Sequence, residues 1–221
     1  MTDDAGLFAT IRERLFTAVI GDVMDKAGLT RQFLPAALRA IVPGTMIVGR
    51  AMPVQVADAG GPGTTGAPYG LTFHALDDLR PGEVYVAAGG TPDYALWGGL
   101  MSTRAMRLGA VGAVLGGPHR DTREIVQLGF PVFSLGAFAQ DQKDRGEATD
   151  FRCRVTFANG TSVAPGDVIV GDGDGVLAIP AASAADIVRD ALAKVTGEDH
   201  VRRAIEAGES TDAVFRRTGI M

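Results

Sequence analysis

The sequence predicts an α/β fold with a mixed β-sheet and a long C-terminal helix. Residues 84–135 alternate short apolar runs with helical patterns, an order typical of parallel strands that are joined by helices. Residues 152–180 return to strand-like patterns with Asn-Gly and Asp-Gly pairs, which favour tight hairpins. Residues 181–208 are rich in alanine and carry apolar side chains at helical spacing. We therefore expect one α/β domain over residues 1–180 and a helical extension over residues 181–221 that packs on a neighbouring subunit.

The N-terminal segment predicts one or two helices over residues 7–28. Gly28 suits the end of a helix, because glycine readily adopts the left-handed backbone found there. Apolar side chains recur every four residues on one face: Leu7, Ile11, Leu15, Val19 and Val23.

Three Pro-Gly pairs, at residues 43–44, 81–82 and 165–166, predict turns that lead into strands. Proline presets the first central backbone angle of a type II turn, and glycine accepts the positive second one. A run with β-branched or aromatic residues follows each pair, "TMIVG", "EVYVA" and "DVIVG". At least three strands are expected to begin after these turns.

Composition excludes several classes of protein. A hydrophobic content of 46% argues against a disordered chain, and a formal charge of −5 argues against a general nucleic-acid binder, which needs a basic face. The apolar stretches are far shorter than the roughly 20 residues of a membrane span, and the acidic N-terminus does not resemble a secretory signal. We expect a cytoplasmic protein. With Cys153 as its one cysteine, any metal would be held mainly by oxygen, with histidine as a further option.

The candidate site lies in "GAVGAVLGGPHRDTREIVQLGFPVF", residues 109–133. His119, Arg120 and Asp121 follow an apolar strand, and ligands tend to bind where the strands of an α/β sheet end. The simplest interpretation makes Asp121 and Glu124 a capping box at a helix start, Arg120 a surface charge and His119 an incidental loop residue.

A glycine pair strengthens the case for a binding site. Gly98 and Gly99 are expected at the start of a helix that ends near residue 109. Small residues there leave the backbone N–H groups of Gly99, Leu100 and Met101 open to an anion, and the helix dipole favours negative charge. An anion site and the Arg120-Asp121 pair would then lie on adjacent loops.

Three other features have simpler explanations. Asp172 and Asp174 in "GDGDGV" are too few for an EF-hand loop and fit a hairpin turn. Trp97 fits a packing role beside the glycines. The glycine-rich loop at 57–70 lacks the Gly-Lys-Ser/Thr ending of a P-loop, and we expect a mobile loop over a pocket.

Nearly the whole chain resembles one family. "GGLMSTRAMRLGAVGAVLGGPHRDTREIVQLGFPVFSLG" places Gly99, twenty further residues, the Arg120-Asp121 pair, two more residues and then Glu124. This spacing is similar to the signature of the RraA-like family, which includes the regulator of ribonuclease E activity and the class II 4-hydroxy-4-methyl-2-oxoglutarate / 4-carboxy-4-hydroxy-2-oxoadipate aldolases. The segments "TAVIGDVMDKAG", "PGTMIVGRAMPVQ", "PGDVIVGDGDGVLAIP" and "GESTDAVFRRTGIM" agree.

The resemblance implies a layered, swivelling β/β/α-type domain that assembles as a homotrimer or homohexamer, with active sites between subunits. In the aldolase branch it implies that Asp121 binds Mg²⁺ or Mn²⁺ and that Arg120 contacts a small 2-oxo acid and its developing enolate. The helix start, Gly98 to Met101, would bind the carboxylate of that acid. The resemblance also implies a metal-side glutamate from the C-terminal helix of a neighbouring subunit, for which Glu198 is the candidate.

The implied activity is that of a divalent-metal-dependent lyase, which cleaves 4-hydroxy-4-methyl-2-oxoglutarate-like substrates or decarboxylates oxaloacetate and releases pyruvate. The alternative is a non-catalytic regulatory protein that binds ribonuclease E-type partners. A methyltransferase is disfavoured, because no strand leads into a glycine-rich nucleotide motif with an acidic ribose partner.

One position departs from the aldolase pattern. The aldolases carry an acidic residue at the position of Gly99, where it helps to place a water molecule for proton transfer. Glycine cannot do this. Asp93, Asp22 or a carboxylate of a neighbouring subunit is the candidate to replace it.

Overall fold

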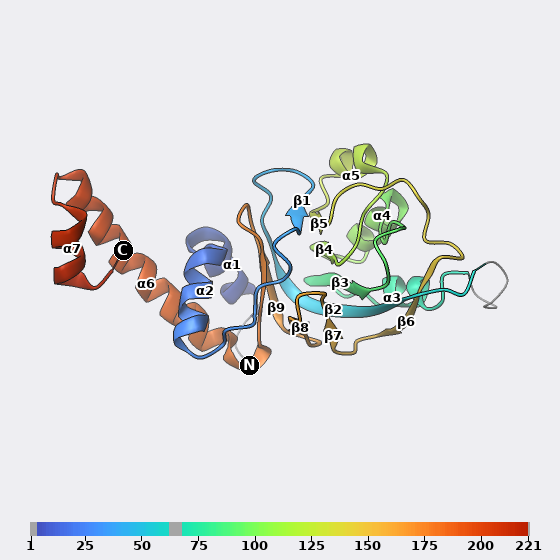
Figure 1. Ribbon diagram of the computed structural model, residues 1–221, viewed down its shortest axis with the longest axis horizontal. Helices are drawn as coiled ribbons and strands as arrows, with labels where there is room; N and C mark the ends of the chain where they lie inside the picture. Colours follow the sequence, from blue (N-terminus) through green and yellow to red (C-terminus); the bar gives the residue numbers. More distant parts are fainter. Residues whose placement is uncertain (1–3, 62–67, 221) are drawn as a thin grey trace.

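An eight-stranded mixed sheet organises the chain, with strand order β1-β5-β4-β3-β2-β9-β10 and with β6 paired to β2 (Figure 1). The computed structural model describes residues 4–61 and 68–220. The strands of this sheet are β1 (Arg39–Ala40), β2 (Ile47–Asp58), β3 (Glu83–Gly89), β4 (Gly112–Leu115), β5 (Val132–Ser134), β6 (Gly146–Phe151), β9 (Val168–Gly171) and β10 (Val176–Ile179). The predicted α/β fold with a mixed sheet is therefore confirmed.

The predicted parallel strands are β3, β4 and β5, and β2 joins them as a fourth parallel strand. The connections between these strands carry three helices: α3 (Thr72–Asp77), α4 (Gly99–Arg107) and α5 (Thr122–Leu128). In β3, Tyr85 and Ala87 face one hydrophobic core, whereas Val84 and Val86 face another. Because both faces are buried, this strand is continuously apolar instead of alternating.

The predicted turns are present. Gly44, Gly82 and Gly166 have backbone φ angles of +80°, +80° and +82°, as the second central position of a type II turn requires. The Asn159-Gly160 pair lies between β7 (Val155–Thr156) and β8 (Ser162–Val163), which form a separate two-stranded hairpin. The Asp-Gly pairs at residues 172–175 join β9 to β10.

A second layer of helices covers the β9–β10 side of the sheet. It contains α1 (Asp4–Arg14), α2 (Thr17–Lys26) and the first half of α6 (Ala184–Glu206), which follows a short 3₁₀ turn (Ala181–Ser183). The expected end of the N-terminal helices is confirmed, since α2 ends at Lys26 and Gly28, two residues later, has a φ of +80°.

The C-terminal helix α6 is 23 residues long and continues through Gly197 without a break. Its far half and α7 (Thr211–Thr218) extend away from the sheet (Figure 1), and Val201 and Val214 are buried there. The packing of this extension on a neighbouring subunit stays a prediction.

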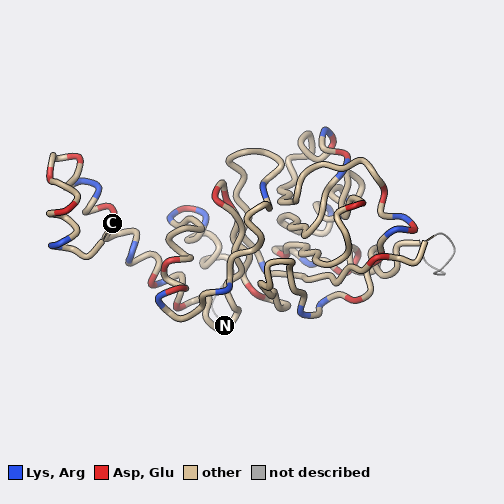
Figure 2. Tube along the Cα trace, viewed as in Figure 1, with Lys and Arg blue, Asp and Glu red and all other residues tan. Residues whose placement is uncertain are grey.

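Charged residues of both signs are interspersed along the trace, including α6 and α7 (Figure 2). Within residues 4–61 and 68–220, no helix is both long and apolar enough to cross a membrane. The central part of the predicted glycine-rich loop, residues 62–67, lies outside the described residues.

Candidate active site

Two loops at the ends of β3 and β4 lie side by side, as the sequence predicts. Arg120 N donates to Trp97 O at 2.9 Å, and Leu96 N donates to Pro118 O at 2.9 Å. Gly98 has an extended backbone, and α4 begins at Gly99. These bonds bring the start of α4 next to the Arg120-Asp121 pair.

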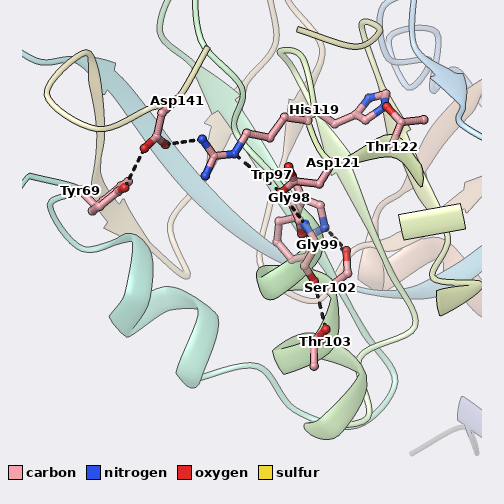
Figure 3. Close-up of polar contacts among 11 residues, drawn as sticks. Tyr69, Trp97, Gly98, Gly99, Ser102, Thr103, His119, Asp121, Thr122 and Asp141 are labelled. Atoms are coloured by element: carbon pink, nitrogen blue, oxygen red, sulfur yellow. Dashed lines mark hydrogen bonds and ion pairs between the residues drawn. The ribbon is translucent and has the colours of Figure 1, made fainter. Parts of the chain in front are cut away.

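The Asp121 carboxylate points toward α4 and does not cap its own helix. Asp121 precedes α5 with a left-handed backbone, at a φ of 57°, and makes no side-chain capping bond. Its Oδ2 instead accepts a hydrogen bond from Gly99 N at 3.1 Å (Figure 3). Aspartate tolerates this backbone region better than most residues. The capping-box interpretation is therefore wrong, and the carboxylate is directed into the site.

Glu124 supplies an acid beside Gly99. A Cβ atom added to Gly99 would lie 2.1 Å from Glu124 Oε2, and one added to Gly98 would lie 2.6 Å from Asp121 Oδ2. The two carboxylates therefore lie directly against the glycine pair. The space that an acidic side chain at position 99 would enter is filled by the carboxylate of Glu124.

Asp93 and Asp22, the two candidates to replace the acid expected at position 99, do not lie beside Gly99. Asp93 lines a different hollow, with Asp58 and Asp144. Asp22 is on α2, where its Oδ2 lies 3.2 Å from Lys194 Nζ. The sequence did not identify Glu124 as the acid beside Gly99, because the spacing of Asp121 and Glu124 is also that of a capping box.

Arg120 is held between two carboxylates, and its side chain is 37% exposed, so it is a paired charge at the protein surface. Its Nη1 lies 3.2 Å from Asp141 Oδ1, and its Nε lies 3.7 Å from Asp121 Oδ2. Asp141 in turn accepts a hydrogen bond from the Tyr69 hydroxyl at 3.0 Å (Figure 3). Burial, followed by the contact with Asp141, raises the pKa of Tyr69 above its usual value. Asp141 and Tyr69 belong to distant segments, and no motif in the sequence marks them.

His119 is buried and holds the loop between β4 and α5 in position. It is 4% exposed, and its Nδ1 lies 2.7 Å from Ser134 Oγ. Its Nε2 lies 3.0 Å from Thr122 Oγ1 (Figure 3). Burial lowers the pKa of His119, which favours the neutral ring. This histidine is a positioning residue that ties the end of β5 to the start of α5, and not an incidental one.

A cleft of about 150 Å³ lies over this network. Its predicted lining residues are Gly98, Leu100, Met101, Arg120 and Asp121, and it also contacts Tyr69, Phe73, Trp97 and Asp141. Trp97 is 1% exposed and donates from Nε1 to Ser102 Oγ at 2.7 Å, which agrees with the packing role expected for it.

The helix start offers part of the predicted anion site. The N–H of Gly99 is taken by Asp121. Within the part of the chain that the structure describes, no acceptor bonds the N–H of Leu100 or Met101. These two groups are therefore available to a ligand at the positive end of the α4 dipole.

The donor set fits a hard divalent cation. Asp121 and Glu124 offer carboxylate oxygens, and Mg²⁺ is commonly bound through one or two carboxylates while it retains several waters. Among the described residues, no group of three or more His, Cys, Asp or Glu side chains is placed to hold a metal.

Glu198 does not belong to this group within one chain. It lies on α6, at the opposite end of the molecule from α4 and α5 (Figure 1), and its Oε1 accepts from Lys194 Nζ at 2.6 Å. A contribution of Glu198 to the site of a neighbouring subunit stays a prediction.

A family profile described as RraA-like, Aldolase/RraA, matches residues 17–178. The chain belongs to the RraA-like family. Among its relatives, a protein of Halalkalibacterium halodurans named "Putative 4-hydroxy-4-methyl-2-oxoglutarate aldolase" is 31% identical over 200 residues, which cover 90% of this chain and 88% of the relative. Protein DlpA of Legionella pneumophila is 27% identical over 197 residues, 89% of this chain, but the match spans only 31% of that longer protein.

Solved structures support the RraA-like fold. An uncharacterized protein from Pseudomonas syringae pv. tomato superposes with a TM-score of 0.81 at 27% identity, over 95% of this chain and 96% of that one. RraAS2 of Streptomyces coelicolor, described as an unusual member of the RNase ES inhibitor RraA protein family, gives a TM-score of 0.79 at 23% identity, over 91% of this chain and 98% of that one. This second likeness concerns the fold alone.

Proposed function

We propose that this RraA-like chain is a divalent-metal-dependent lyase, which releases pyruvate from a small 2-oxo acid by retro-aldol cleavage or decarboxylation. The observation that carries the proposal is the placement of the Asp121 and Glu124 carboxylates against Gly98 and Gly99, with the Arg120 guanidinium beside them. The name carried by the relative from Halalkalibacterium halodurans supports an aldolase.

The substrate head would be held by the start of α4. Its carboxylate is expected to accept from the free N–H groups of Leu100 and Met101, where the helix dipole favours an anion. Arg120 then places a fixed positive charge beside the 2-oxo group, where negative charge develops as the bond breaks.

Asp121 is the proposed ligand of Mg²⁺ or Mn²⁺, with Glu124 as the nearby second carboxylate. The cation, when bound, would act as a Lewis acid that withdraws electron density from the 2-oxo group. Glu124 is the proposed acceptor of the proton of the C4 hydroxyl, because its carboxylate lies against Gly99. The C3–C4 bond then breaks, its electron pair stays on C3 as the enolate of pyruvate, and C4 becomes the carbonyl carbon of the second product.

Assembly into a homotrimer or homohexamer is part of the same proposal, because Glu198 can reach this site only from another copy. Light scattering of the purified chain tests it: a monomer in solution would remove Glu198 from the site.

The test of function is pyruvate release from oxaloacetate and from 4-hydroxy-4-methyl-2-oxoglutarate, followed with lactate dehydrogenase. We expect turnover with Mg²⁺ or Mn²⁺, loss with EDTA, and loss in Asp121→Asn. The matched control is Asp174→Asn, which changes an exposed aspartate outside the cleft. Rates no higher than those of the metal alone would contradict the lyase and favour the regulatory alternative, a protein that binds ribonuclease E-type partners.

A further inference from the structure

A buried glutamine lines the cleft next to Asp141. Gln142 is 4% exposed and belongs to the lining of the cleft over the Arg120-Asp121 pair. Within residues 4–61 and 68–220, hydrogen bonds reach its backbone carbonyl but not its side-chain amide. No fully enclosed side-chain nitrogen or oxygen in that part of the chain lacks a partner, so the amide is open to the cleft. A buried amide needs a partner there, which a ligand can supply.

The backbone holds Gln142 in a fixed position. Its carbonyl oxygen accepts hydrogen bonds from Arg145 N and Gly146 N, each at 2.9 Å. Two residues earlier, Gln140 O accepts from Ala95 N at 2.8 Å, and Ala95 also lines the cleft. Because the backbone around Gln142 is tied down before a ligand arrives, binding has less conformational freedom to remove.

Gln142 follows Asp141, on the far side of Arg120 from Asp121. Nη1 of Arg120 faces Asp141 Oδ1 at 3.2 Å, and its Nε faces Asp121 Oδ2 at 3.7 Å (Figure 3). In the proposed reaction, the head of the 2-oxo acid occupies the Asp121 end of the cleft. The far end of the substrate would then extend along Arg120 toward Gln142.

An amide at this end suits a second carboxylate. The side-chain nitrogen of Gln142 has two N–H donors, and a carboxylate is an acceptor. The negative charge of Asp141 is already paired with Arg120, and its carboxylate accepts from the Tyr69 hydroxyl. A neutral donor also suits decarboxylation of oxaloacetate, because a strong ion pair would stabilise the bound carboxylate more than the transition state in which it leaves as CO₂.

We propose that Gln142 is a specificity-determining residue, whose side-chain N–H donates to the far carboxylate of a dicarboxylic 2-oxo acid. The inference rests on the proposed function and deepens it, since oxaloacetate and 4-hydroxy-4-methyl-2-oxoglutarate both carry a second carboxylate. The contact concerns binding alone. Residues that a neighbouring subunit adds to the cleft would act beside this amide.

Two 2-oxo acids that the proposed reaction does not cleave test the contact by calorimetry with the full chain and Mg²⁺. 2-Oxoglutarate carries the far carboxylate, and 2-oxopentanoate lacks it. Gln142→Met keeps the length of the side chain but removes its N–H donors. We expect this variant to raise the Kd of 2-oxoglutarate at least fivefold and to leave the Kd of 2-oxopentanoate within twofold. Gln142→Glu keeps the shape and repels a carboxylate, so it should raise the Kd of 2-oxoglutarate further.

Gln127→Met is the matched control, because Gln127 lies on α5, is exposed and does not line the cleft. It should leave both Kd values unchanged. In turnover of 4-hydroxy-4-methyl-2-oxoglutarate, Gln142→Met should raise KM at least fivefold with kcat within twofold, because the contact is the same in the bound substrate and in the transition state. Gln142→Glu retains the packing volume and decides the matter if Gln142→Met folds poorly.

A 2-oxoglutarate Kd that changes less than fivefold in both Gln142 variants would overturn this inference and leave the lyase intact. Equal weakening of the two probes would also overturn it, because a merely structural role of Gln142 affects the head that both probes share. Failure of both probes to bind the unmodified chain, together with no pyruvate release from either substrate, would overturn the proposed function and this inference with it.

Discussion

Asp172 and Asp121 each accept a hydrogen bond from the first N–H of an α-helix, and they serve different purposes. Asp172, in the β9–β10 hairpin, accepts from Thr17 N and Thr17 Oγ1, each at 2.7 Å, and also from Asp174 N at 2.9 Å. Both of its oxygens are engaged. Asp121 accepts from Gly99 N at 3.1 Å through Oδ2, and its side chain is 41% exposed.

The difference lies in how much of each carboxylate the fold itself uses. Asp172 joins the hairpin to the start of α2, so its hydrogen bonds are directed inward and structural. Asp121 lines a cleft, and no donor within residues 4–61 and 68–220 bonds its Oδ1. A carboxylate with spare acceptor capacity at a helix start is available to a metal or a substrate, whereas a fully engaged one stabilises the fold.

The largest effect is expected from Asp121→Asn. Asparagine keeps the shape and tolerates the left-handed backbone, so the melting temperature should hardly change. The loss of the negative charge should lower kcat/KM for pyruvate release about 100-fold or more, which corresponds to about 2.7 kcal/mol. Activity within threefold of the unmodified chain would place Asp121 with Asp172 as a structural residue.

Asp172→Ala should lower the stability of the fold and leave activity unchanged, the opposite of Asp121→Asn. Thr17 is 1% exposed, so its N–H and hydroxyl would lose their partner in a buried position. We expect the free energy of unfolding in urea to fall by roughly 2 kcal/mol, with kcat/KM unchanged. Asp174→Ala, at the exposed neighbour, is the control and should leave stability unchanged.

Asp141→Asn should have a smaller effect on activity. It removes one of the two carboxylates that hold Arg120, so the guanidinium becomes less well positioned and kcat/KM should fall about tenfold, or about 1.4 kcal/mol. The charge of Asp141 also raises the pKa of Tyr69, so the variant should show a lower pKa for that hydroxyl in a spectroscopic titration. An unchanged Tyr69 titration would contradict the arrangement in Figure 3.

The smallest effect concerns Asp58, a third aspartate engaged by the fold. The Thr91 N–H, followed by the Tyr94 hydroxyl, lowers the pKa of Asp58 below its ordinary value of 3.8. A depressed pKa stabilises the fold at every pH above 3.8, and this contribution is lost as the pH falls through the folded-state value. In Asp58→Asn, the drop in the free energy of unfolding between pH 6 and pH 3 should therefore be slightly smaller. An identical drop would show that Asp58 contributes nothing.

Local signals sufficed for the framework of the fold. Proline and glycine have narrow conformational preferences, so the turns at residues 43–44, 81–82 and 165–166 could be predicted from two residues each. The alternation of buried strands and helices from β3 to β5 could likewise be predicted from periodicity, because each element must bury an apolar face.

The site was less predictable because side-chain direction depends on distant segments. The spacing of Asp121 and Glu124 fits a capping box, and only the approach of α4 shows that both carboxylates turn away from α5. Asp141 and Tyr69 reach Arg120 from parts of the chain that no local pattern connects. The role predicted for Glu198 is in the site of a neighbouring subunit, so it depends on a contact between two chains.

The close approach of the Glu124 carboxylate to Gly99 couples substitutions at these two positions. A side chain at 99 would displace the Glu124 carboxylate, since its Cβ would lie 2.1 Å from Oε2, and the exposed Glu124 side chain is free to turn away. Both carboxylates cannot occupy this one place at once. Glu124→Ala alone should be harmful, and adding Gly99→Asp should recover part of what it loses, because the new carboxylate would enter the space that Glu124 has left.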